Sequence, residues 1–353
     1  MQNIFKTRMA LIQAPMYHYS TPELAAGVSN AGCLGALAPQ NPKHLRESII
    51  KVQQLTSNPF ACNVFLFPPQ LTSNQPKLPD PIRCLLNSYR RELGIPIDPT
   101  GPLHTQFDDS MLQLDVINDL KVPVIIFTFG IPSTSLIDKI RLENPDCVLV
   151  GSATSVEESI SIANAGLDAV IIQGVEAGGH RTSSSLPSYG MIGLNALIPL
   201  VKQKVSIPVF AAGGITNQLQ IKSALGLGAN GVSIGTLFLT CTECKTPPRH
   251  RAWLTSEGTK ETVVTRLFTG RPARMFKNRF YNEMQACVDR HAIKDCEIPW
   301  NLYARDVFAA ASKQNRDDLF IIWAGQSAGL LGHGETKCAS EIIKDLESAF
   351  NLE

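Results

Sequence analysis

Residues 171–180 read Ile-Ile-Gln-Gly-Val-Glu-Ala-Gly-Gly-His, and this stretch indicates the fold more directly than any other. The apolar run Ala169–Ile172 predicts a short buried strand. The strand stops at a glycine, and the glycine-rich turn that follows lets the backbone approach a ligand closely. His180 comes next, and imidazole is the side chain best suited to proton transfer near neutral pH. A strand that ends in such a loop is typical of a catalytic loop on an α/β scaffold.

The composition predicts a globular protein and excludes several classes of partner. The chain has 353 residues, enough for one barrel-sized domain with an appendage, and 44% of them are apolar. Lys and Arg number 32 against 31 Asp and Glu, so we expect no surface for nucleic acid or for an anionic membrane. No apolar run is long enough to span a bilayer, and Met1–Met9 lacks the features of an export signal. The 9 scattered cysteines predict a reducing, cytoplasmic location.

Strand-like segments alternate with helices between Met9 and Ile234. Thr21-Pro22 and Asn41-Pro42 are typical helix starts. This rhythm and length predict a (β/α)8 TIM barrel, for which about 250 residues are typical, and the alternative is a doubly wound open sheet. The expected strands are Met9–Ala14, Cys33–Leu37, Phe60–Leu66, Pro123–Thr128, Cys147–Val150, Asp168–Ile172, Pro208–Ala212 and Gly231–Ile234.

The alternation is interrupted once and is lost before the C-terminus. Residues 67–105 are rich in Pro, Ser, Thr and Asn, with one helical patch at Ile82–Leu93, and we interpret this long insertion as a lid. The expected domains are a barrel over residues 1–244 that includes this insertion, a smaller mixed α+β extension over residues 245–334, and a final helix over residues 335–353 that packs back on the barrel.

The strand ends should carry the chemistry, because barrel enzymes place their active sites at the carboxyl ends of the strands. Ala14-Pro15-Met16 predicts a stiff apolar turn that suits the face of a planar ring, with an ordinary turn as the alternative. Asn63 lies among apolar residues, so its amide needs a partner in a heteroaromatic ligand or in the backbone. In the opening loop, Gln173 offers a donor and an acceptor, and Gly178 exposes its N–H.

Two further loops predict a phosphate site. Gly213-Gly214 follows the seventh expected strand, and Ser233-Ile234-Gly235-Thr236 ends the eighth. Loops at these places in a barrel commonly bind phosphate through backbone N–H groups, and the alternative is a pair of tight turns without a ligand. The stretch Gly226–Gly231 matches GxGxxG, but it follows a helix and precedes a strand, so it is no dinucleotide motif. Cys241 and Cys244 lack a second pair of ligands, so we predict no metal site.

Together these motifs resemble the nitronate monooxygenase family (formerly 2-nitropropane dioxygenases), which are FMN-dependent (β/α)8 barrels. The likeness covers nearly the whole chain, from Gln13–Met16 through Gln173–Arg181 and Gly231–Thr236. Flavin-dependent enoyl reductases share the Glu-Ala-Gly-Gly-His loop. Thr-Gly-Arg-Pro-Ala-Arg at 269–274 and Trp-Ala-Gly-Gln at 323–326 favour the nitronate family.

The resemblance implies that His180 is the catalytic residue and that Tyr303 lies near the substrate. Tyr17-His18-Tyr19 stands where the family has small residues, so we expect His18 beside the substrate, in a reshaped pocket. The FMN contacts that the resemblance implies are Ala14, Pro15, Met16, Asn63, Gln173, Gly178, Gly213, Gly214, Ser233, Ile234, Gly235 and Thr236.

The expected activity is an FMN-dependent oxidative denitrification of alkyl nitronates, such as propionate 3-nitronate, by dioxygen, with His180 binding the substrate or acting as base. One alternative is an FMN-dependent enoyl-thioester reductase that uses NAD(P)H. Another is a flavin-free barrel isomerase or lyase of a phosphorylated metabolite. We leave the oligomeric state open, with a homodimer as the assembly considered.

Overall fold

The computed structural model describes residues 4–67, 78–97, 109–183, 190–256, 261–293, 303–332 and 336–351. Its main feature is one sheet of parallel strands. These strands are β1 (Leu11–Gln13), β2 (Gly35–Leu37), β3 (Phe60–Phe65), β4 (Val124–Thr128), β5 (Val148–Ala153), β6 (Ala169–Gln173), β8 (Val209–Ala212) and β9 (Gly231–Ile234).

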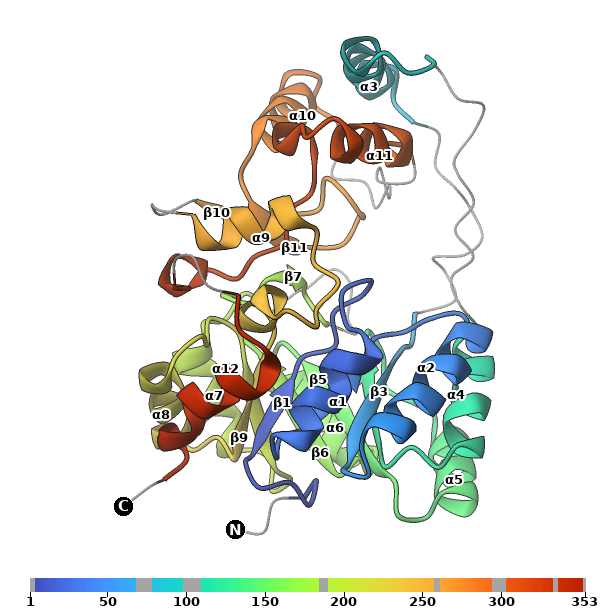
Figure 1. The fold of residues 1–353 in the computed structure, drawn as a ribbon, viewed down its shortest axis with the longest axis vertical. Helices are drawn as coiled ribbons and strands as arrows, with labels where there is room; N and C mark the ends of the chain where they lie inside the picture. The colour runs from blue at the N-terminus through green and yellow to red at the C-terminus, as the bar shows by residue number, and fades with distance from the viewer. Residues whose placement is uncertain are drawn as a thin grey trace.

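The sheet is nearly closed, and its strands follow in the order β1-β9-β8-β6-β5-β4-β3-β2. Figure 1 labels β1, β3, β5, β6 and β9 in the lower part of the molecule. A parallel bridge between Ile12 and Leu34 joins its two ends, β1 and β2. The predicted TIM barrel is therefore confirmed, and the doubly wound open sheet is excluded. All eight strands of the barrel overlap the segments predicted from the sequence.

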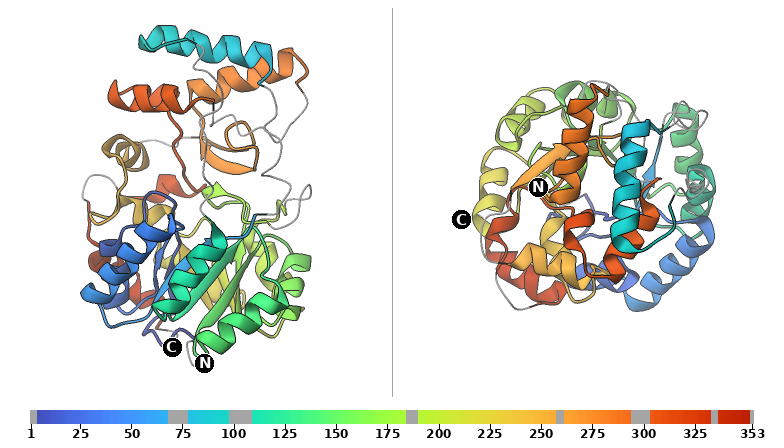
Figure 2. Two further views of the ribbon diagram at one scale, coloured as in Figure 1. Left: turned by 90° about the vertical axis from the view of Figure 1, so that its right-hand side faces the viewer. Right: turned by 90° about the horizontal axis from the view of Figure 1, so that it is seen from above.

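Helices surround the barrel, as the sequence rhythm predicted (Figure 2). The Thr21 side chain accepts a hydrogen bond from the Leu24 N–H and so caps the first helix, and Asn41 caps the second by accepting from His44. The surrounding helices are α1 (Pro22–Asn30), α2 (Pro42–Leu55), α4 (Ser110–Asp119), α5 (Thr134–Glu143), α6 (Val156–Asn164), α7 (Leu194–Lys202) and α8 (Gln218–Gly226).

Apolar side chains fill the inside of the barrel. Ile12, Ile126, Ile171 and Phe210 come from four different strands and belong to one buried cluster. Phe5 joins this cluster from the N-terminal segment, with its ring centroid 4.8 Å from that of Phe210. The barrel is thus a packed core rather than a channel, and a ligand can be bound only at its mouth.

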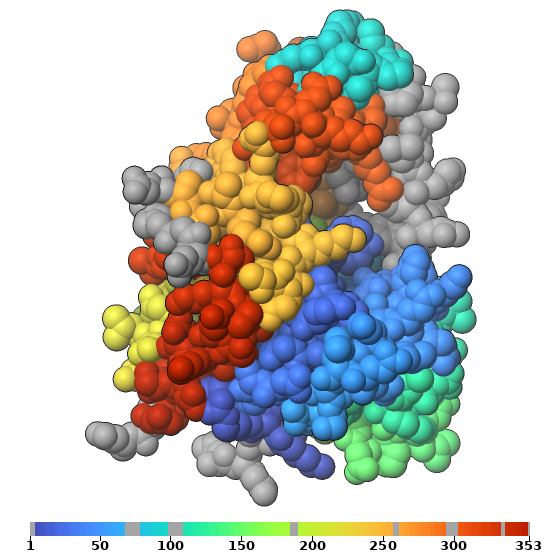
Figure 3. Space-filling view, viewed as in Figure 1, coloured from blue at the N-terminus to red at the C-terminus, as the bar shows by residue number. Residues whose placement is uncertain are grey.

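A C-terminal extension stands on one end of the barrel (Figures 1 and 3). Its core joins α3, which belongs to the insertion after β3, to helices from the last third of the chain through Tyr89, Phe280 and Val307. The Nε of Arg90 lies 2.8 Å from a carboxylate oxygen of Asp306 across this contact. The elements are α3 (Asp80–Leu93), α9 (Pro248–Thr255), β10 (Thr262–Thr265), β11 (Ala273–Phe276), α10 (Arg279–Arg290) and α11 (Arg305–Lys313).

The insertion that we interpreted as a lid is described only in part. Its helix α3 packs in the core of the extension, whereas residues 68–77 and 98–105 lie outside the described residues. The lid stays a prediction. No helix in the described ranges combines the length and the apolarity needed to cross a bilayer.

One strand of the extension comes from the opening loop of the barrel itself. The short strand β7 (Gly179–His180) pairs antiparallel with β11, so that Ala273 lies opposite His180 and Arg274 opposite Gly179. The sequence pattern predicted neither strand. Near the C-terminus, α12 (Ala339–Leu346) buries Ile342 and Ile343 in the barrel's outer core beside α1. We keep the domain boundaries 1–244, 245–334 and 335–353 as a proposal.

The contact between β2 and α1 gives a test of the fold. A Cβ on Gly35 would lie 1.9 Å from the carbonyl oxygen of Ala25, and backbone on both sides prevents an easy adjustment. We expect Gly35→Ala to lower the free energy of unfolding by about 3 kcal/mol, measured by urea denaturation. Gly226→Ala is the matched control, because a Cβ there meets nothing within 4 Å. It should leave stability unchanged or raise it by about 0.5 kcal/mol. Equal midpoints for the two variants would contradict the packing described.

Candidate active site

Several of the predicted residues meet at the barrel mouth, where β1 and β9 end. The Ala14 N–H donates to the Ile234 carbonyl at 2.8 Å. A Cβ placed on Gly235 would lie 3.5 Å from the Ala14 Cβ and 4.0 Å from the Met16 Sδ. Ala14, Pro15 and Met16 are all partly exposed. The mouth therefore has a small apolar wall at this side.

The loop between β6 and β7 is organised by Arg181, which is fully buried. Its Nη1 donates to the Gln173 Oε1 at 2.9 Å and to the Gly174 carbonyl at 2.5 Å. Its Nη2 donates to the carbonyls of Gln173 at 2.8 Å and of Gly190 at 2.6 Å. Burial lowers the pKa of the guanidinium to about 10, which still leaves it charged at neutral pH. Arg181 thus fixes the backbone from which His180 projects.

Gln173 supports the same loop. Its Nε2 donates to the His180 carbonyl at 2.9 Å, and its Oε1 also accepts from the Thr182 N–H at 3.1 Å. The side chain was predicted to contact the cofactor. In the structure its Oε1 accepts from two protein donors, and one of its two Nε2 hydrogens makes no hydrogen bond with the described residues.

His180 lies between the barrel and the extension. Its Nε2 is 2.8 Å from the hydroxyl of Thr269, and its ring centroid is 5.4 Å from that of Trp323 and 6.1 Å from that of Phe129. Burial, and secondly the charge of Arg271, lowers the pKa of His180 to about 4. The imidazole is therefore neutral at physiological pH and has a lone pair for a proton.

Arg271 places a positive charge close to this imidazole. Its guanidinium carbon lies 4.4 Å from the centroid of the Phe129 ring, and its Nη2 donates to the Ser183 carbonyl at 3.1 Å. Phe129 itself has a φ of +69°, a conformation rare outside glycine. Stacking of this kind stabilises a cation away from water. Arg271 was not predicted as a site residue from the sequence.

Gly213 and Gly214 form a tight turn after β8. Their φ angles are +116° and +67°, and a Cβ on Gly214 would lie 3.1 Å from the Glu176 Cβ. The N–H groups of Gly213, Gly214 and Gly235 make no hydrogen bond within the described part of the chain. Three unbonded donors at adjoining strand ends are typical of an anion-binding cradle.

Thr236 and Gly178 both contact the Trp-Ala-Gly-Gln segment of the extension. The Thr236 hydroxyl accepts from the Gly325 N–H at 3.0 Å, which leaves its own proton free to donate to a ligand. A Cβ on Gly178 would lie 2.5 Å from the Gly325 nitrogen, so only glycine fits. Since Trp323 contacts His180, this one segment borders both the imidazole and the predicted phosphate loop.

The remaining predicted cofactor residues lie deeper. The Asn63 Nδ2 donates to the Ile126 carbonyl and to the Thr128 hydroxyl, each at 2.8 Å. For that nitrogen, partners within the protein core therefore replace the ligand that was considered from the sequence. Ser233 and Ile234 are buried in β9. A ligand at the mouth would meet the Ile234 region through its backbone rather than through these side chains.

The two predicted substrate residues have different surroundings. His18 has a φ of +68° and its ring centroid lies 3.8 Å from that of Tyr17. Burial, and then the charges of Arg305 and Lys245, lowers the pKa of His18. Tyr303 lies at the edge of the extension's core, where its carbonyl accepts from Arg90 at 2.6 Å.

Besides Arg271, the residues Arg181, Thr269 and Phe129 shape the site and were not predicted from the sequence. Arg181 follows His180 directly, and a charged residue next to a catalytic candidate was the available signal. Thr269 belongs to the Thr-Gly-Arg motif, which was used only as evidence of family. Phe129 follows a predicted strand end, yet nothing in the local pattern indicates its ring contact with His180.

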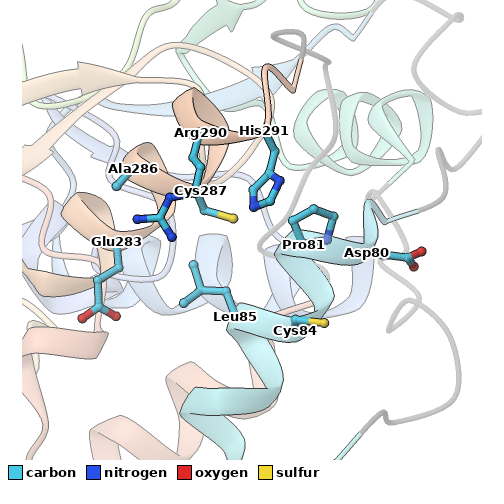
Figure 4. Close-up of a pocket in the computed structure, with 9 residues that line it drawn as sticks. All are labelled: Asp80, Pro81, Cys84, Leu85, Glu283, Ala286, Cys287, Arg290 and His291. Carbon is cyan, nitrogen blue, oxygen red and sulfur yellow. The ribbon is translucent and has the colours of Figure 1, made fainter.

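A separate groove of about 630 Å³ opens between α3 and α10 (Figure 4). Its lining includes Cys84, Leu85, Cys287 and Arg290, and none of the predicted site residues. Because it lies in the helical part of the extension, we do not connect it with the chemistry of the barrel mouth.

The whole chain matches a known family. The family model for nitronate monooxygenase matches residues 1–348. A protein named "Probable nitronate monooxygenase" from Staphylococcus aureus (strain MSSA476) is 37% identical over 345 residues, covering 97% of this chain and 94% of the relative. A solved nitroalkane oxidase from Streptomyces ansochromogenes has a TM-score of 0.83 and 32% identity, covering 98% of this chain and 96% of that one. FabK from Thermotoga maritima has a TM-score of 0.73 at 24% identity, over 99% of this chain and 94% of that chain, which shows the fold alone.

A barrel mouth with a neutral imidazole, a nearby cation and a glycine cradle defines an enzyme site rather than a simple binding module. The chain belongs to the nitronate monooxygenase family, and it is therefore an oxidoreductase. The resemblance stated from the sequence is confirmed.

The low pKa of His180 can be tested through Arg271. We expect Arg271→Gln to raise the pKa from about 4 part of the way toward 6.5, because the charge is the second cause and burial the first. Arg271→Lys keeps the charge and is the control. The measurement is an NMR titration of the histidine ring, assigned by loss of its signal in His180→Asn. An unchanged pKa in Arg271→Gln would show that the charge has no influence.

Proposed function

We propose that the chain catalyses the FMN-dependent oxidative denitrification of alkyl nitronates, such as propionate 3-nitronate, with dioxygen. The observation that carries this proposal is the Trp323–Gln326 segment, which borders His180 on one side and the phosphate-loop residue Thr236 on the other. A ligand with a phosphate on the cradle would extend along this segment toward the imidazole.

The residues present fit flavin mononucleotide. The unbonded N–H groups of Gly213, Gly214 and Gly235 suit a phosphate group. The Thr236 hydroxyl can donate one more hydrogen bond to the phosphate. The wall formed by Ala14 and Met16 suits one face of a flat ring. No cation is required at the cradle, since backbone donors bind phosphate in many barrels.

The chain's own residues account for substrate binding and proton handling. FMN, when bound, supplies the redox chemistry. His180 is neutral at physiological pH, so it can receive a proton from a nitroalkane or hydrogen-bond a nitronate. The Arg271 charge favours an anionic group beside the imidazole. The aromatic rings of Phe129 and Trp323 restrict the space around the reacting carbon.

An enoyl-thioester reductase is the second candidate. It is favoured by the Glu-Ala-Gly-Gly-His loop at residues 176–180, which flavin-dependent enoyl reductases share. The structural likeness to FabK shows the fold alone. Anaerobic mixing with NADH distinguishes the two. Rapid bleaching of the flavin would favour the reductase, whereas slow or absent bleaching would favour the nitronate enzyme.

Removal of the imidazole should separate binding from turnover. We expect His180→Asn and His180→Ala to keep the yellow colour of bound flavin but to lose about 10²-fold or more in kcat, since general acid–base catalysis typically contributes that much. Steady-state oxygen uptake with a panel of nitronates measures this. Turnover equal to the wild type would remove His180 from the mechanism.

The cradle makes a complementary prediction. Gly214→Ala should purify with much less flavin, because its φ of +67° is strained for alanine and its Cβ would lie 3.1 Å from that of Glu176. The absorbance ratio of flavin to protein gives the occupancy. Gly226→Ala, which has open space at its Cβ, should keep full occupancy. A colourless wild type that FMN does not reconstitute would instead favour a flavin-free isomerase or lyase.

A further inference from the structure

Thr269 lies in the connection between β10 and β11, outside the barrel. Its hydroxyl oxygen is 2.8 Å from the Nε2 of His180 and 3.2 Å from the carbonyl oxygen of Arg271. The N–H of Arg271 donates to the same hydroxyl at 3.4 Å. The hydroxyl therefore has three neighbours, and the carbonyl oxygen is the one that cannot donate.

One tautomer of His180 allows all three hydrogen bonds at once. A threonine hydroxyl has a single proton, and the Arg271 carbonyl can only accept it. The Nε2 of His180 must then carry a hydrogen and donate to Thr269. A neutral imidazole has one N–H, so Nδ1 keeps its lone pair.

The Nδ1 atom is available to a ligand. It makes no hydrogen bond with the described residues, so its lone pair has no partner among them. Burial and the charge of Arg271 keep the ring neutral. The geometry thus gives His180 a fixed donor at one nitrogen and an open acceptor at the other.

We propose that Thr269 is a positioning residue that holds His180 in the Nε2–H tautomer, so that Nδ1 is the proton acceptor of the site. The inference rests on the proposed function, and it names the ring nitrogen that would receive the proton of a neutral nitroalkane. In the step, the C–H bond beside the nitro group breaks and its proton moves to Nδ1. The electron pair moves onto the nitro group and a nitronate forms, while Nε2–H stays on Thr269.

The backbone geometry makes a substitution at Thr269 informative. The pairing of β7 with β11 places Ala273 opposite His180 without using the threonine hydroxyl. Thr269→Val therefore removes the hydroxyl at nearly constant volume, and Thr269→Ser keeps it. The two variants separate hydrogen bonding from packing.

The kinetic test compares two substrates on the flavin-loaded enzyme. With nitroethane, Thr269→Val should lower kcat/KM by about 10-fold or more, because proton transfer needs the acceptor nitrogen in place. With ethyl nitronate prepared beforehand, no C–H bond has to break, and the value should stay within about 2-fold of the wild type. Thr269→Ser should resemble the wild type with both. Equal losses of Thr269→Val on both substrates, or none on either, would overturn the proposal.

A second readout does not depend on turnover. Nitrogen-15 NMR of the histidine rings should show the hydrogen on Nε2 of His180 in the wild type and in Thr269→Ser, and a mixture of tautomers in Thr269→Val. A hydrogen on Nδ1 in the wild type would refute the inference even if the valine variant failed to fold. If the wild type turned over neither substrate, the proposed function would fail, and the NMR result would still decide the tautomer.

Discussion

The antiparallel pairing of β7 with β11 is the constraint on which the candidate site depends. Two residues that follow a barrel strand, Gly179 and His180, complete a sheet of the extension. Strand pairing fixes orientation as well as position, since a slip of one residue would turn each side chain to the opposite face. The imidazole thus takes its direction from the extension, although its chain neighbours belong to the barrel. Buried Arg181 holds the other side of the loop through the carbonyls at the end of β6.

The barrel was predictable because its signals are local. Each strand is a short apolar run, and helix starts such as Thr21-Pro22 carry their own caps. The strand β7 was not predicted, and the reason is physical. Gly179 has a φ of +73° and β7 is only 2 residues long, so β7 has no alternation of apolar and polar residues that a sequence pattern could indicate. Such a strand exists because a partner distant in sequence lies beside it, and that is tertiary information.

The residues of the site also divide into those indicated by local sequence and those that only the tertiary fold brings together. Glycine-rich strand ends indicated the loop of His180 and the turn at Gly213-Gly214, because glycine is the residue that adopts positive φ angles without strain. The partners of the imidazole were not predictable in this way. Thr269 lies 89 residues from His180 along the chain, and its hydroxyl matters only because the fold brings it within 2.8 Å. The aromatic contacts from Phe129 and Trp323 likewise come from separate elements.

The placement of α3 bears on how this architecture can change during evolution. The chain leaves the barrel after β3, supplies Tyr89 to the core of the extension, and returns for α4 before the extension's other helices are reached. The extension is therefore built from two separate segments of the chain, and neither segment contains the whole of its core. Recombination at a single junction therefore cannot transfer the extension to another barrel. It also cannot remove the extension without leaving α3 without the helices that it packs against. Barrel and extension should consequently be inherited together, and changes on one side of their contact should be matched by changes on the other.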